Sequence, residues 1–147
     1  MKRTAVQLVF ACALLAAPLT VVLLLPDRGS PQGDTAEPRE VVLIIRAQEL
    51  LAFSAIGDRW VSQDLLTGEQ VESRRTASHV ALVVTNVRVL GFSADRNRWD
   101  QLRLEPGERV LVDAAQGRVA SVQTNVRALG FGARRGEWVA TRWRRGT

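Results

Sequence analysis

The chain of 147 residues contains little of the chemistry that metal, redox or nucleophilic sites use, with one cysteine, one histidine and no tyrosine. The single cysteine, Cys12, excludes an internal disulfide, and one histidine with one cysteine cannot form a structural zinc site. No serine or cysteine nucleophile motif surrounds the histidine, His79, and no glycine-rich phosphate loop opens a helix. We therefore expect no cofactor, no metal and no enzymatic activity.

The charge of the chain is biased but weakly so. Lys2 is the only lysine, every other basic residue is arginine, and the formal net charge is +5. A bias of this size does not by itself indicate binding to nucleic acid. We do not expect nucleic acid as a partner.

The N-terminal segment has the pattern of a membrane-targeting sequence. Lys2 and Arg3 precede an apolar run from Ala5 to Leu25, which would rise about 30 Å as a helix, enough to cross a bilayer. We interpret residues 1–26 as a hydrophobic helix that acts as an uncleaved signal anchor, with a cleaved signal peptide as the alternative.

The basic start predicts an N-terminus that stays in the cytoplasm. The expected location is therefore the inner membrane, with a single pass and the C-terminal domain outside the cytoplasm. After cleavage it would be secreted or periplasmic. Residues 27–39 are rich in Pro, Gly, Ser, Asp and Glu, which predicts a flexible linker.

The remainder of the chain repeats with a period of 39 residues. The sequence contains four Phe and four Trp, and three of each keep this period, which predicts a tandem array of one supersecondary unit. We expect these six aromatic residues to form the repeated structural core of a domain over residues 40–147, with repeats at about 40–78, 79–117 and 118–147. The six are Phe53, Phe92, Phe131, Trp60, Trp99 and Trp138.

The second repeat shows the strands of the unit best. Apolar or alternating runs occupy 79–84, 87–94, 99–104 and 109–113, and turn residues such as Glu105-Pro106-Gly107-Glu108 separate them. The unit is predicted to be an up-and-down meander of four antiparallel strands, so that the fold class is all-β. Because the sequence ends near the turn before the fourth strand of the third repeat, we expect eleven strands, with the last repeat lacking its fourth.

The aromatic turns resemble those in the blades of quinoprotein-type and kelch-type β-propellers, where a strand ends in a turn that leads to a docking Trp. The matching segments are 92–99 and 131–138. The segment 84–92 is also similar to uncharacterised bacterial tandem β-repeat proteins. These resemblances imply propeller-like blades and no activity. A β-trefoil is the alternative closure of three repeats.

Three blades are fewer than a closed ring typically needs, so we expect open blade edges that bind another protein or a second copy of the chain, for instance as a six-bladed ring. The leading hypothesis is a membrane-tethered binding or scaffold module. One alternative is an enzyme whose site forms in a central channel on oligomerisation, and another is a fragment of a longer propeller.

Two sets of residues are candidates for binding. Arg88 and Arg127 occupy equivalent positions, where they could line a channel for an anionic ligand or pair with a carboxylate. The C-terminal segment could bind anionic lipid or an envelope polymer through interleaved basic and indole groups, or be a solvated edge. The residues of this segment are Arg142, Arg144, Arg145 and Trp143.

Overall fold

The computed structural model describes residues 40–144, which form strands and turns with no helix among them. The predicted signal segment and linker lie outside the described residues. No helix long and apolar enough to cross a membrane occurs within residues 40–144. The all-β prediction is confirmed, and the described residues contain the expected eleven strands.

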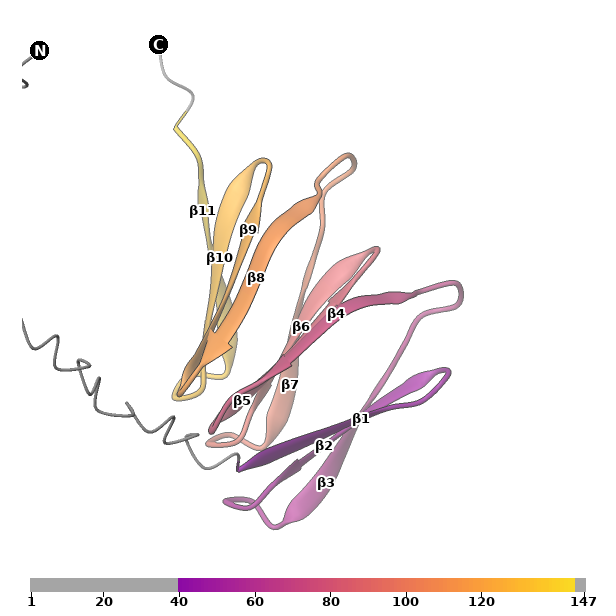
Figure 1. Ribbon diagram of the computed structural model, residues 1–147, viewed down its shortest axis with the longest axis vertical. Coiled ribbons are helices and arrows are strands. Elements are labelled where there is room, and N and C mark those ends of the chain that lie inside the picture. Colours follow the sequence, from indigo (N-terminus) through magenta and orange to yellow (C-terminus); the bar gives the residue numbers. More distant parts are fainter. Residues whose placement is uncertain (1–39, 145–147) are drawn as a thin grey trace, which may run out of the picture. The chain divides into compact units, whose positions relative to one another are not determined.

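The strands form three antiparallel sheets that follow one another in chain order (Figure 1). Within each sheet, every strand pairs with the next strand of the chain, as in a meander. The first sheet contains β1 (Val41–Ile45), β2 (Glu49–Ser54) and β3 (Arg59–Asp64). The second contains β4 (Val71–Thr76), β5 (Val80–Thr85), β6 (Arg88–Ser93) and β7 (Arg98–Arg103). The third contains β8 (Val110–Gln116), β9 (Val119–Thr124), β10 (Arg127–Gly132) and β11 (Glu137–Arg142).

The division into sheets corrects one prediction. The fourth strand of each sequence repeat was expected to complete its own sheet, but β4 pairs with β5, and β8 with β9, of the repeat that follows. The reason is the connections: Gly117, with a φ of 53°, and Arg118 form a two-residue hairpin turn between β8 and β9. Residues 104–109 are instead long enough to cross the roughly 10 Å between stacked sheets. The third sheet therefore has all four strands, and the sheet with three is the first.

The turns repeat as closely as the strands do. The turn before the third strand of each repeat has one residue with a positive φ at the same position, namely Asp58 (46°), Asn97 (51°) and Gly136 (66°). Asp and Asn tolerate this left-handed conformation and Gly adopts it without strain. Three different residue types thus give one backbone path.

The core lies between the sheets. Every residue of β5 and β6, the two central strands of the second sheet, is buried. One cluster, around Ala52 and Phe92, joins the first and second sheets, and another, around Leu82 and Phe131, joins the second and third. The second sheet is therefore covered on both faces by its neighbours.

Candidate functional site: ion-pair clamps and end faces

The candidate channel residues Arg88 and Arg127 lie in two equivalent ion pairs. The Arg88 guanidinium donates from Nε and from a terminal nitrogen to the two carboxylate oxygens of Glu69, both at 2.8 Å. A terminal nitrogen also donates to the carbonyl of Asp64, at 2.8 Å. The Arg127 guanidinium binds Glu108 at the same two distances. Bidentate pairs of this kind are strong and fix geometry, and they occupy the groups that an anionic ligand would need.

Each pair fastens a connection between sheets. Glu69 lies in the segment that leads from β3 to β4, and its carboxylate accepts hydrogen bonds from the Leu66 amide at 2.7 Å and the Thr85 hydroxyl at 2.6 Å. Its side chain has no exposed surface, and that of Arg88 is 7% exposed. The carboxylate thus joins the crossover segment to the end of β5 and the start of β6. Glu108 and Thr124 repeat this arrangement in the third sheet.

These contacts set the protonation of both carboxylates. Burial raises the pKa of Glu69, but the hydrogen bonds from Arg88, the Leu66 amide and Thr85 outweigh it, so its pKa lies below the ordinary 4.5. Burial likewise raises the pKa of Glu108, and the bonds from Arg127, the Glu105 amide and Thr124 lower it further than burial raises it. Both groups are therefore ionised at neutral pH.

Acid should weaken the fold through these two carboxylates. Because their folded pKa lies below 4.5, the unfolded chain takes up protons that the folded chain excludes as the pH falls through this value. The stability that they contribute is complete above the unfolded pKa and is lost as the pH falls toward the folded one. Urea midpoints of the full-length chain, measured from neutral pH to about pH 3, should decrease more steeply than those of the Glu69→Gln/Glu108→Gln variant. Equal slopes would contradict this assignment.

His79 and the two carboxylates of Asp95 and Asp100 are each held in contacts with other parts of the fold. The Nδ1 atom of His79 lies 3.0 Å from a carboxylate oxygen of Asp95, and the other oxygen of Asp95 accepts from Arg118. Asp100 accepts the backbone N–H of Trp138 at 2.9 Å. Among residues 40–144, no three His, Cys, Asp or Glu side chains cluster as a metal site would require.

The C-terminal candidates are fastened to the third sheet where they are described. Arg142 donates to Glu105 at 2.6 Å, and the Trp143 indole donates to the carbonyl of Thr124 at 2.9 Å, with 47% of Trp143 exposed. Arg144 is exposed, and Arg145 lies outside the described residues.

The repeated aromatic residues form pairs across neighbouring strands. Each Phe lies opposite the Trp of the next strand, with ring centroids 5.2–5.4 Å apart in the three sheets. Residues opposite one another share a face of a sheet, and successive residues on a strand alternate between faces. Each pair therefore belongs to a row of three residues, which we call the aromatic row. The rows are Val42–Phe53–Trp60, Ala81–Phe92–Trp99 and Ala120–Phe131–Trp138.

The next row of each sheet points to the opposite face, and we call it the receiving row. These rows are Leu43–Ala52–Val61, Leu82–Gly91–Asp100 and Ser121–Gly130–Val139.

The aromatic row of one sheet contacts the receiving row of the sheet before it. Trp99 donates its indole N–H to the carbonyl of Val61 at 3.1 Å, and Phe92 clusters with Ala52. Trp138 donates in the same way to the carbonyl of Asp100 at 3.3 Å. The Phe131 ring lies so close to Gly91 that an added Cβ would be 2.7 Å from it. One docking interaction is thus used twice within the chain.

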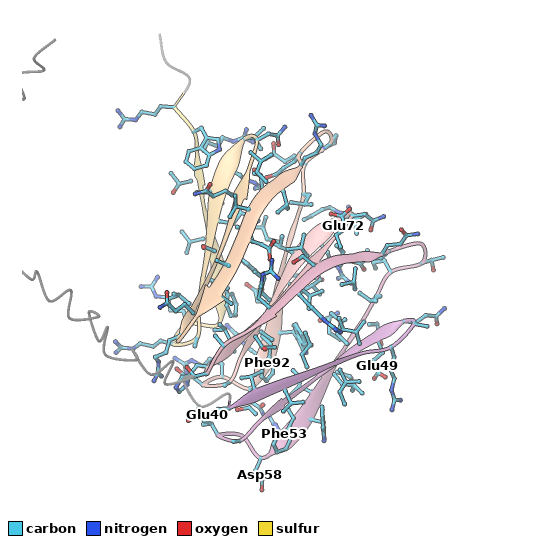
Figure 2. The ribbon with its side chains drawn as sticks, viewed as in Figure 1. Glu40, Glu49, Phe53, Asp58, Glu72 and Phe92 are labelled. Atoms are coloured by element: carbon cyan, nitrogen blue, oxygen red, sulfur yellow. The ribbon has the colours of Figure 1, made fainter. Side chains whose placement is uncertain are left out.

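Two rows remain without a partner among residues 40–144. The aromatic row of the first sheet lies on its outer face, where Val42 and Trp60 are each 49% exposed. Figure 2 shows Phe92 between the first and second sheets, and Phe53 on the first sheet. On the third sheet, the receiving row opens into an apolar hollow lined in part by Val119, Gly130 and Val139. We call these two surfaces the end faces.

The sequence contained signals for these contacts that prediction from it did not use. Glu69 and Glu108 are 39 residues apart, as are Thr85 and Thr124, so the partners of both Arg residues keep the repeat. The small residues of the receiving row, Ala52, Gly91 and Gly130, keep it as well. Comparison of the chain with protein-family models and with curated proteins found no match.

Proposed function

We propose that this protein is a non-catalytic binding or scaffold module that acts through its two end faces. The observation that carries the proposal is the contrast between the covered second sheet and the outer sheets. Phe92 and Phe131 are 0% and 2% exposed, whereas Trp60, Val119 and Val139 are 49–60% exposed. Contiguous exposed apolar patches on a soluble domain mark interaction sites.

Within this proposal, the three sheets are blades of a propeller-like stack, in agreement with the resemblance of their turns to propeller blades. The membrane anchor is residues 1–26, and the linker of residues 27–39 places the sheets on the outer side of the inner membrane. The Arg residues contribute by fastening the blades. The two described contacts of the C-terminal segment, Arg142 with Glu105 and Trp143 with Thr124, support a structural role there.

Photocrosslinking in the host cell tests whether the end faces are covered. A photoreactive amino acid in place of Val42 or Val139 in the full-length chain should give a crosslinked product of higher mass from each position. The matched control is Gln48, which is exposed in the turn between β1 and β2 and lies on neither row. Adducts no more abundant from the two faces than from Gln48 would contradict the proposal.

A further inference from the structure

The two end faces correspond to the two sides of the contact that joins neighbouring sheets within the chain. Within the chain, an aromatic row docks on a receiving row at two places, and the same residues or close equivalents recur at each. The first sheet presents an aromatic row, and the third sheet presents a receiving row. We propose that the partner of each end face is a second copy of this chain, bound head to tail, which deepens and rests on the proposed function.

The internal contacts predict the contacts between copies residue by residue. Trp99 and Trp138 donate to the carbonyls of Val61 and Asp100, and Val139 is the equivalent position on the third sheet. The Trp60 indole therefore donates to the Val139 carbonyl of the other copy. Phe53 lies over Gly130, as Phe131 lies over Gly91.

The third sheet has room for this ring. A Cβ added at Gly130 would meet no atom within 4 Å, whereas one added at Gly91 would meet the Phe131 ring. The hollow around Gly130 is also apolar, because Val119 and Val139 contribute to its lining. Burying such groups under an aromatic pair supplies the driving force for association.

The charged side chains at the edge of the proposed contact are complementary as well. Arg98 of the second sheet donates to Glu137 of the third, its equivalent one repeat later, at 3.1 Å. The equivalent of Arg98 on the first sheet is Arg59, which is exposed. Glu137 is 61% exposed at its side chain, so it faces Arg59 of the docked copy with opposite charge.

A head-to-tail contact uses different surfaces on the two copies, so it leaves one end face free on each until the assembly closes. Two copies contribute six sheets, which lies within the usual range of four to eight blades for a closed propeller. A second copy presents both an aromatic row and a receiving row, so it can cover both end faces.

Two variants of the full-length chain, each altered on one end face, test the proposal by sedimentation in a density-matched detergent. Trp60→Ala removes the indole from the aromatic row, and Gly130→Arg fills the receiving row and opposes Arg59. Each variant alone should associate at least about 30-fold more weakly than the parent chain, since a central Trp is a typical hot spot of an interface. Gln48→Arg is the matched control, because it adds the same charged side chain at an exposed position that lies on neither row, and it should associate like the parent.

Mixing the two variants distinguishes a head-to-tail contact from a contact between like faces. The intact aromatic row of Gly130→Arg can dock on the intact receiving row of Trp60→Ala, so the mixture should form a two-chain complex. Loss of association in only one of the variants would indicate contact between like faces and overturn the proposal, as would a parent chain that sediments as a single copy. If the parent is a single copy but the end faces crosslink to a different protein in cells, the binding function stands and self-association fails. If the end faces crosslink to no protein, both the proposed binding function and the proposed self-association fail.

Discussion

Replacing Phe92 by alanine should lower the free energy of unfolding by about 3–5 kcal/mol, the range for deleting a fully buried aromatic side chain. Phe92 has 0% exposure and packs in the cluster that joins the first and second sheets through Val41, Ala52, Ala81 and Ala94. Its removal leaves a cavity that neighbouring sheets cannot fill, because both are fixed by their own strand pairing. The measurement is urea unfolding of the full-length chain in detergent.

Phe53→Ala is the matched control for this prediction. Phe53 occupies the same position of the repeat, but it lies on the outer face of the first sheet, where it pairs with Trp60. In the unassociated chain its loss should be about 1 kcal/mol, because only part of the ring leaves water on folding. Equal losses for Phe53 and Phe92 would contradict the assignment of the first sheet as an open end.

Replacing Arg88 by methionine should also lower the free energy of unfolding by about 3–5 kcal/mol, because it leaves the carboxylate of Glu69 buried without its partner. The Glu69 side chain has no exposed surface and receives two hydrogen bonds from Arg88. The carboxylate must then take up a proton or draw in water, and the crossover segment loses its attachment to the second sheet.

Two companion variants make this result specific. Arg88→Met/Glu69→Leu should recover much of the stability, since an apolar pair of similar volume removes the uncompensated charge. Arg98→Met, which breaks a pair whose side chains are 52% and 61% exposed, should cost less than about 1 kcal/mol. If the double variant were no more stable than Arg88→Met, the lost contacts of the arginine and not the buried charge would explain the effect.

The sequence predicted the strands well because each carries its own local signal. The expected strands at 79–84 and 99–104 are observed as Val80–Thr85 and Arg98–Arg103, and the turns between them contain the residues that such turns require. The 39-residue period predicted that Phe and Trp would recur in equivalent places. They do so, as three Phe–Trp ring pairs of similar geometry.

The boundaries of the sheets could not be predicted in the same way. Whether β8 pairs with the strand before it or the strand after it depends on the path of residues 104–109 between sheets, and the period is unchanged by the choice. The repeat was the only sequence signal for the pairing partner of Arg88, because Glu69 is 19 residues away in a connection that local patterns assign only as a turn. Contacts of this range are decided by tertiary packing.

The mass of the unaltered full-length chain in solution tests the central claim most directly. One docking interaction used twice within the chain leaves one aromatic row and one receiving row to be used between chains. Sedimentation in a density-matched detergent should therefore give the mass of two chains, or a higher multiple, and the species should dissociate on Trp60→Ala. A single chain at all concentrations, or an assembly that Trp60→Ala leaves intact, would contradict the account.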